Sequence, residues 1–397
     1  MSDRARLGVF DYGFRTFFLL APLYGALAVV VWVAELLGWL PIPSSVPPAL
    51  LHAHEMIFGF AGAALAGFFL TAVPNWTGAK ALRGAPLAGL AALWLAGRVA
   101  MAALGPVPPG LAAVVDLAFL PALALAVIGP LLAAGKKRNL VLLVPLTLFW
   151  SADAAMQAQF AGWTGADIAA TASRVGIDIL LLFIAVIGGR IVPAFTGNVL
   201  RASGTARLPR SLPALDRAAL VAMALLVLAE ASGSAPTTGA LAALACVLNA
   251  VRLALWRGTR TAGSPILWVL HLGYLWLVAG LGLKAAAAFS LVPETAALHA
   301  LSVGAIGTMI FAVMSRAGLG HTGRPLKAQA ATVLAYVLVS AAALLRVAAS
   351  LKSGWFVLLL VLSAAAWAAA SLLFLADYAP ILLLRSGHAG DHEPPHG

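Results

Sequence analysis

Apolar runs of about 20 residues recur along the whole chain, and this feature limits the fold more than any other. Of the 397 residues, 62% are hydrophobic and 10% are charged. Soluble domains carry about 25% charged residues, so this composition is typical of an integral membrane protein. Because unpaired backbone groups are costly in lipid, segments of this length cross a bilayer as helices. The sequence therefore predicts an all-α, polytopic membrane helix bundle.

Turn residues divide the apolar runs into about twelve predicted transmembrane helices. Their approximate ranges are 16–39, 49–74, 84–104, 108–134, 139–160, 167–192, 212–232, 236–256, 264–289, 295–317, 327–350 and 354–384. We expect residues 1–384 to form a single transmembrane helical domain, and residues 385–397 to form a polar cytoplasmic tail that is disordered. No small-residue cleavage motif precedes a short apolar core at the N-terminus, so we expect the first helix to be retained.

Lysine and arginine are concentrated in alternate loops, which predicts the orientation of the chain. The basic loops contain Arg4, Arg6 and Arg15; Lys80 and Arg83; Lys136, Lys137 and Arg138; Arg201, Arg207 and Arg210; Arg257 and Arg260; Arg316, Arg324 and Lys327; and Arg385. Cytoplasmic loops carry such an excess, so the pattern fits twelve spans with both termini in the cytoplasm. The formal net charge of +11 has the same explanation and does not indicate nucleic acid as a partner.

Three titratable residues, His52, His54 and Glu55, stand at the head of the apolar run 51–78. Such groups are costly in or near hydrocarbon unless something binds them, and neutral imidazole is a ligand of haem iron and copper. Residues two apart on a helix point about 200° apart, so we expect the two histidines to have different partners. The motif therefore predicts a metal or haem site in the membrane.

Another histidine, His299, lies at a similar predicted depth near the outer end of the tenth span. Two imidazoles from two helices at one depth commonly hold a b-type haem, which makes His54 and His299 the candidate pair. A third imidazole nearby could hold copper, and Glu55 would be either a second-shell acceptor or a proton carrier. His271 lies about two turns into the ninth span, and His321 lies in a cytoplasmic connection.

Basic residues on the predicted cytoplasmic face are candidates for binding haem propionates or another anion: Arg190, Arg316 and Arg324. Ordinary positive-inside charge is the alternative explanation for all of them. Arg190 is expected at a helix end beside the helix-breaking Pro193. The tail histidines His388, His392 and His396 are expected to be exposed to solvent.

Other ionisable residues lie inside the predicted spans: Arg98, Asp116, Asp153, Arg174 and Asp178. The last two are four residues apart and are expected to pair on one helix face. The single cysteine, Cys246, is expected to pack as a small hydrophobic residue. The second and tenth spans also share a faint repeat, because each begins with Leu-His-Ala and ends with Thr-Gly before a basic residue.

Four long motifs resemble the signature blocks of the NnrS family of bacterial inner-membrane proteins. They are HAHEMIFGFAGAALAGFFLTAVPNWTG, GGRIVPAFTGN, HLGYLWLVAGL and HALSVGAIGTMIFAVMSRAGLGHTGRP, within a resemblance that runs from about Phe10 to about Tyr378. It implies a multi-pass protein of the inner membrane, linked to denitrification and to nitrosative stress, with haem and copper as cofactors. The family's histidine positions then correspond to His52, His54, His271, His299 and His321, with Glu55, Arg190, Arg316 and Arg324 in the same blocks.

Three functions stay open at this point. The first is a protein that handles or detoxifies nitric oxide with haem b and copper, whether or not it turns nitric oxide over as an oxidoreductase supplied by an electron donor. The second is a transporter, which predicts a central cavity with discontinuous helices. The third is a membrane sensor or metal-delivery protein, whose metal site binds without turnover.

Overall fold

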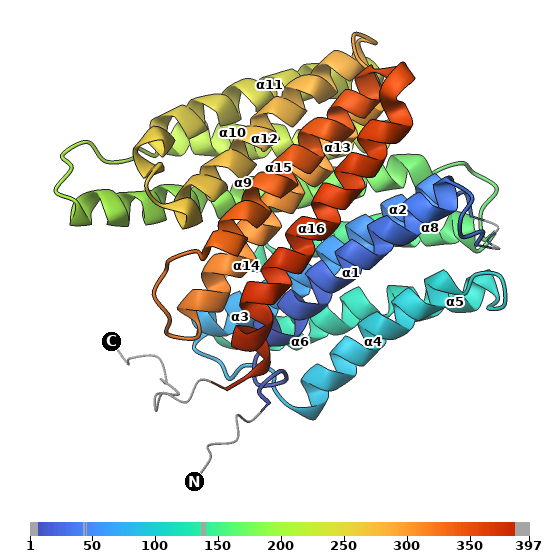
Figure 1. Ribbon diagram of the computed structural model, residues 1–397, viewed down its shortest axis with the longest axis horizontal. Helices are drawn as coiled ribbons and strands as arrows, with labels where there is room; N and C mark the ends of the chain where they lie inside the picture. Colours follow the sequence, from blue (N-terminus) through green and yellow to red (C-terminus); the bar gives the residue numbers. More distant parts are fainter. Residues whose placement is uncertain (1–6, 43, 45, 136–139, 386–397) are drawn as a thin grey trace. The chain divides into compact units, whose positions relative to one another are not determined.

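The computed structural model describes residues 7–42, 44, 46–135 and 140–385. Every regular element of these residues is a helix, which confirms the predicted all-α class (Figure 1). Several residues of the sequence prediction lie outside the described ones: Arg4, Arg6, Lys136, Lys137, Arg138, His388, His392 and His396. The predicted tail lies outside them too, except for its first residue, Arg385.

Each of the twelve predicted ranges contains a helical segment. Among the residues that the structure describes, ten segments are long and apolar enough to cross a membrane. They are α1 (Gly13–Leu36); α2 (Pro48–His54) continued by η1 (Glu55–Ala61) and α3 (Gly62–Thr77); α4 (Ala85–Ala102); α5 (Pro109–Leu117) with α6 (Phe119–Ala133); α9 (Ala169–Ala202); α11 (Ala235–Leu255); α12 (Pro265–Ala288); α13 (Glu294–His299) continued by η3 (Ala300–Gly307) and α14 (Thr308–Gly320); α15 (Ala330–Leu351); and α16 (Phe356–Leu383).

The other two predicted ranges contain α8 (Leu143–Phe160) and α10 (Pro213–Ser232), which carry several polar or charged side chains. Two short 3₁₀ turns, η2 (Gly258–Thr261) and η4 (Ser353–Trp355), lie in connections. Ten candidate spans agree with a multi-pass membrane protein. The count of twelve spans and the cytoplasmic position of both termini stay predictions.

The helix around Arg190 differs from the prediction. We expected a helix end before Pro193, but α9 continues through this proline to Ala202. A proline removes one backbone hydrogen bond, and transmembrane helices tolerate this loss where neighbouring groups satisfy the freed carbonyl. Arg190 therefore lies within a helix rather than at its end.

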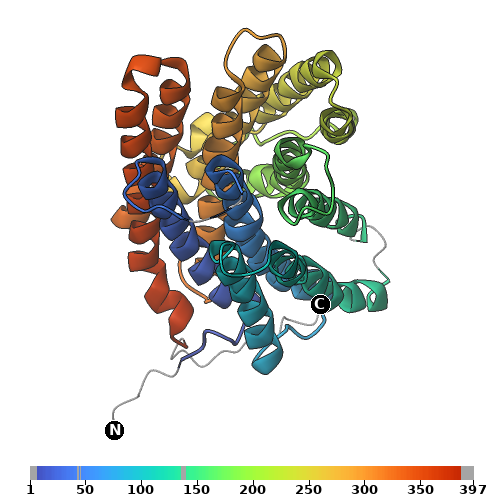
Figure 2. The same cartoon turned by 90° about the vertical axis from the view of Figure 1, so that its right-hand side faces the viewer.

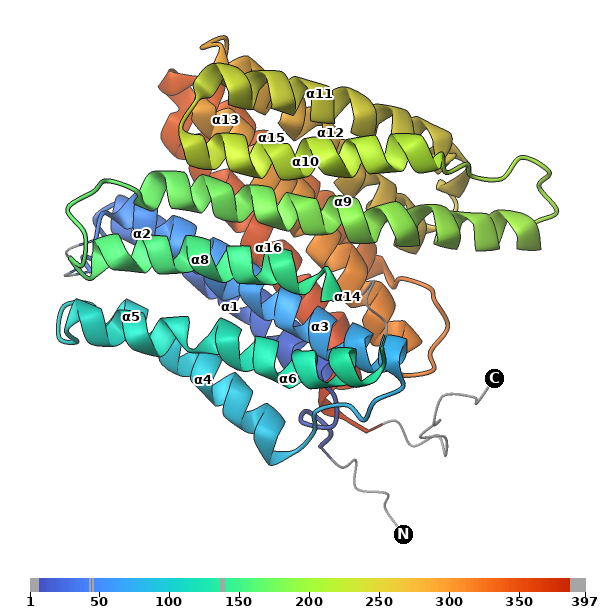
Figure 3. The same ribbon diagram turned by 180° about the vertical axis from the view of Figure 1, so that it is seen from behind.

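Contacts divide the chain into two compact units. Unit 1 comprises residues 1–173, 317–325 and 374–397, and unit 2 comprises residues 174–316 and 326–373. In unit 1, α1 packs along η1 and α3, as Figure 2 shows for the two blue helices. Helices α4, α5, α6 and α8 lie side by side in the same unit (Figure 3). These helices enclose the residues of the site described below.

In unit 2, α11 packs against both α10 and α12 (Figure 1). Helix α12 also packs along η3. Glycines allow the second contact to be close. A Cβ on Gly280 would lie 2.4 Å from Leu301 Cδ2, and one on Gly304 would lie 2.6 Å from Trp276 Cδ2. Small residues of this kind let helix backbones approach one another in membrane proteins.

The two helices with the faint sequence repeat also share an unusual backbone. Each changes from α-helix to π-helix directly after a histidine, at His54 before η1 and at His299 before η3. At the far ends, Gly78 and Gly323 both have positive φ, 74° and 68°. π-helices are rare and are often found at functional sites. In this register His54, rather than His52, corresponds to His299.

Candidate metal centre

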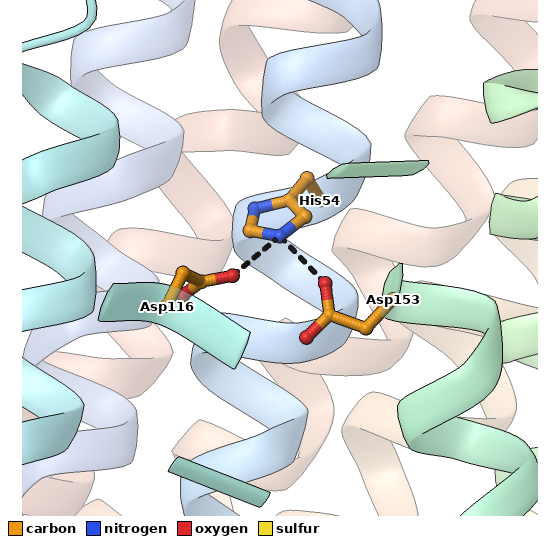
Figure 4. Close-up of side chains that lie close together, drawn as sticks. All are labelled: His54, Asp116 and Asp153. Carbon is orange, nitrogen blue, oxygen red and sulfur yellow. Dashed lines mark hydrogen bonds and ion pairs between the residues drawn. The ribbon is translucent and has the colours of Figure 1, made fainter. Parts of the chain in front are cut away.

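The imidazole of His54 is fully buried in unit 1 and is surrounded by carboxylates. Its Nδ1 donates to Glu55 Oε1 at 2.8 Å, because an ionised carboxylate can only accept. Its Nε2 lies 3.0 Å from Asp153 Oδ1 and 3.1 Å from Asp116 Oδ2. Figure 4 shows both carboxylates directed at this one nitrogen. The three side chains form a group whose ligand atoms are close enough to hold a metal ion.

Arg98 is the cation of this cluster. Its Nη1 donates to Glu55 Oε2 at 2.7 Å, and its Nη2 donates to Asp116. Glu55 also accepts a hydrogen bond from the Tyr24 hydroxyl. The guanidinium therefore fixes two of the carboxylates, and Glu55 in turn fixes the orientation of the His54 ring. Carboxylates that accept from the second nitrogen of a ligating histidine are typical of metal sites.

Gln157, on α8, completes the surroundings of His54. Its side-chain nitrogen lies 3.0 Å from His54 Nε2, 2.7 Å from Asp116 Oδ2 and 3.2 Å from Met101 Sδ. The residue is fully buried, and its side-chain oxygen has no hydrogen-bond partner. Buried polar atoms almost always have a partner, so this oxygen needs an explanation.

The cluster lies at one depth in unit 1. Two members lie near the start of the longer segments Pro48–Thr77 and Pro109–Ala133, and two lie in the C-terminal parts of α4 and α8. Counted from Pro48, Ala102, Pro109 and Phe160, each of the four side chains is four to seven residues from the end of its segment: His54, Arg98, Asp116 and Asp153. At 1.5 Å per residue the centre is therefore about 6 to 11 Å inside the helix ends.

Two glycines make room for this arrangement. A Cβ on Gly97 would lie 2.8 Å from Asp116 Oδ1 and 3.2 Å from Asp116 Cα, so α4 and α5 meet closely there. A Cβ on Gly59 would lie 2.8 Å from Arg98 Nη1. Gly59, the first glycine of the motif FGFAG, therefore leaves the space through which the guanidinium of Arg98 reaches Glu55. At both Gly59 and Gly97, a larger side chain would collide with a member of the charged cluster.

The other two predicted histidines of unit 1 lie away from this centre. His52 stacks on Trp32 with ring centroids 4.1 Å apart, so the two histidines of the motif have different partners, as their spacing predicted. The ring of His321 lies 5.5 Å from that of Phe14. Gly13, which precedes Phe14 in the chain, packs against Leu70 of α3. Leu70 lies 16 residues beyond His54 in the same helical segment. His321 is therefore roughly 24 Å from His54 along the helices.

The remaining histidines belong to unit 2. The Nε2 of His271 lies 2.9 Å from Thr196 Oγ1, and its Nδ1 lies where a Cβ on Gly258 would be 2.6 Å away. The Nδ1 of His299 donates to the carbonyl oxygen of Thr295 at 2.7 Å. The packing of α12 on η3 and α14 separates these two histidines by about 17 Å along the helices.

The predicted arginines do not form one cluster within a unit. Arg316 belongs to unit 2, and its guanidinium lies 3.7 Å from the ring centroid of Phe195. Arg190, in the same unit, is exposed. Arg324 is exposed and belongs to unit 1. Their role as a clamp for propionates stays a prediction.

The prediction that Arg174 pairs with Asp178 is wrong. Arg174 Nε lies 2.5 Å from Glu230 Oε1 and 3.3 Å from Glu294 Oε1. Asp178 instead accepts from Lys284 Nζ at 2.6 and 2.8 Å. Neighbouring helices offer these closer partners, so interhelical pairs replace the pair along α9.

Four residues of the centre were missing from the predicted site: Arg98, Asp116, Asp153 and Gln157. A usable signal was present for the first three, since an ionisable residue inside a membrane helix is by default a functional candidate. Their common distance from the helix ends would have grouped them with His54. Gln157 carries no charge and gave no comparable signal.

The comparisons with known proteins agree with the resemblance seen in the motifs. A search of curated proteins finds no match for this chain. The family described as NnrS protein matches residues 8–385, nearly the whole chain. Because this match covers nearly the whole chain, the chain belongs to the NnrS family.

Proposed function

We propose that this chain is a multi-pass protein of a bacterial inner membrane that binds and handles nitric oxide through a metal ion in unit 1. The observation that carries the proposal is the arrangement of His54. Glu55 holds one ring nitrogen, and the other nitrogen faces two carboxylate oxygens among apolar helices. Membership of the NnrS family supplies the link to nitric oxide in this proposal.

Each residue of the centre has a distinct role in the proposal. His54, Asp116 and Asp153 hold the metal ion, and Glu55 orients the imidazole. Arg98 is a positioning residue that fixes two carboxylates. When bound, a redox-active ion would supply a coordination site for nitric oxide and a means of exchanging electrons. Of the two roles predicted for Glu55, second-shell acceptor and proton carrier, the proposal takes the first, so Glu55 is a positioning residue.

The depth of the centre suits this ligand. Nitric oxide is small and uncharged, so it dissolves in hydrocarbon and can reach a buried site without an aqueous channel. Polar oxidants reach the same place less easily, because burial imposes a cost of desolvation on them. With the predicted orientation, the centre lies near the outer face of the membrane. The proposal also includes a partner that donates electrons to the centre from one face of the membrane.

The cofactors expected for the family fit this centre to different degrees. An axial ligand of haem needs a ring nitrogen that faces a space wide enough for a porphyrin, but three side chains lie within 3.1 Å of His54 Nε2. This geometry argues against haem at His54. One imidazole with carboxylate oxygens is a donor set that divalent copper accepts, whereas monovalent copper prefers sulfur ligands. A bare divalent ion therefore fits this centre better.

The test is a measurement of nitric oxide binding by the full chain in detergent. The protein is purified anaerobically, its metal content is determined, and optical and spin-resonance spectra are recorded before and after nitric oxide is added. We expect a metal-nitrosyl signal that is absent in His54→Ala and present in His271→Ala, the matched control from unit 2. A folded, metal-loaded protein without this signal would favour a transporter or a metal-delivery protein instead.

A further inference from the structure

The geometry points to a site for one first-row divalent cation, such as Mn²⁺, Fe²⁺ or Zn²⁺, in which Gln157 is a fourth protein ligand beside His54, Asp116 and Asp153. This inference rests on the metal centre proposed above and goes further by naming the class of ion and an additional ligand. Sequence analysis gave no indication of Gln157. The inference depends on three observations of unit 1, which concern charge, acceptor geometry and an unpartnered oxygen.

The first observation is an imbalance of charge. Glu55, Asp116 and Asp153 are buried, with 8%, 4% and 2% of their surfaces exposed, and Arg98 is the cation that contacts two of them. With His54 neutral, three negative charges and one positive charge leave two negative charges in excess. Burying unpaired charge is strongly unfavourable. One divalent cation would make the cluster neutral.

The second observation is that several atoms with lone pairs face one another beside the Nε2 atom of His54. Since Nδ1 of His54 donates its proton to Glu55, a neutral ring presents a lone pair at Nε2. This lone pair faces oxygens of Asp153 and Asp116 at 3.0 and 3.1 Å. Ligand atoms that share a first-row metal at about 2.1 Å lie about 3.0 to 3.4 Å apart. The spacing is that of neighbouring ligands around one ion.

The third observation is the side-chain oxygen of Gln157, which is fully buried and has no hydrogen-bond partner. The amide nitrogen of the same group lies 3.0 Å from His54 Nε2 and 2.7 Å from Asp116 Oδ2. A half-turn of the amide exchanges its oxygen and nitrogen. The oxygen then enters the point where the other ligands meet, and a cation there gives it a partner.

The resulting donor set determines the class of ion. One imidazole nitrogen and three oxygens suit borderline and hard divalent ions, whereas monovalent copper and iron–sulfur clusters need thiolates or thioethers. The nearby thioether, Met101 Sδ, contacts the amide nitrogen of Gln157 at 3.2 Å. Calcium takes six to eight oxygen ligands, about twice the number offered here.

The experiment measures metal binding rather than activity. The full chain in detergent is stripped with a chelator and titrated separately with Mn²⁺, Fe²⁺, Zn²⁺ and Cu⁺. Bound metal is counted after desalting, and the spin-resonance spectrum of Mn²⁺ reports its immobilisation. We expect one divalent ion per chain and at least tenfold weaker binding in Gln157→Leu. Gln157→Glu should restore binding, because an ionised oxygen replaces the amide oxygen.

The matched control is Glu230→Gln, which changes a buried carboxylate of unit 2 and should bind as wild type does. Size-exclusion profiles show that each variant is folded. Wild-type affinity in Gln157→Leu, or a folded wild type that retains only Cu⁺, would overturn the inference. Stoichiometric divalent binding without a nitrosyl signal would instead refute the proposed function alone. A nitrosyl signal that survives without a divalent ion would refute this inference alone.

Discussion

Two buried clusters of charge in this protein differ in one respect. In unit 1, Arg98 contacts two of the three buried carboxylates, Glu55 and Asp116. In unit 2, Lys284 Nζ lies 2.6 Å from Asp178 and 2.9 Å from Glu230, and Arg174 contacts Glu230 and the exposed Glu294, so two cations meet the two buried carboxylates. Intramembrane charge alone therefore does not identify a binding site. The two clusters differ in net charge. In unit 2 the buried carboxylates are matched by two cations, whereas in unit 1 they outnumber the one cation that contacts them, so that cluster needs a further cation.

The balanced cluster should be the more sensitive to loss of its cation. Lys284→Ala leaves Asp178 with no ammonium partner inside unit 2, and breaking a buried pair in this way costs about 3–5 kcal/mol. The measurement is chemical unfolding of the detergent-solubilised protein. Lys327→Ala, which removes an exposed lysine of the same unit, should stay within about 0.5 kcal/mol of wild type. A loss below about 1 kcal/mol in Lys284→Ala would show that the network is not self-sufficient.

Metal should stabilise unit 1 and leave the network of unit 2 unaffected. At a free Mn²⁺ concentration of 100 times the dissociation constant, the folded state gains about 2.7 kcal/mol relative to protein in chelator. Unfolding curves with and without chelator measure this gain. Lys284→Ala should show the same gain despite its lower stability, whereas His54→Ala should show none. An equal gain in His54→Ala would place the stabilising ion elsewhere.

Neutralising one aspartate in each cluster should have opposite effects in metal-free protein. Asp153→Asn removes one of the excess negative charges, and we expect a gain of about 1 kcal/mol in chelator. Asp178→Asn removes the acceptor of two hydrogen bonds from Lys284 and should lose about 1–3 kcal/mol. Both values come from unfolding curves in chelator. Changes of the same sign in the two variants would contradict the difference in charge balance.

The sequence predicts the helices better than the site, because a helix depends on local hydrophobicity whereas the site depends on which helices pack together. Apolar runs set helix positions directly, so each predicted range contains a helix to within a few residues, apart from α9 beyond Pro193. The contacts of a buried charge depend on which helices are neighbours. His54 and Glu55 were recognisable from their motif, but Asp116 and Asp153 join them only because α5 and α8 bring these side chains to His54. The same lack of neighbour information produced the wrong pair of Arg174 with Asp178.

The smallest expected effect separates the two histidines of the motif at Leu51 to Glu55. His52 stacks on Trp32, an interaction typically worth about 0.5–1.5 kcal/mol, so His52→Ala should lose that much stability and keep the full metal content. His52→Phe should recover the stability, because an aromatic ring restores the stack. Metal analysis and unfolding curves are recorded on the same preparations, with His54→Ala as the variant that loses its metal. If His52→Ala lost its metal as well, both histidines would serve one centre, and the difference between the two sides of this helix would disappear.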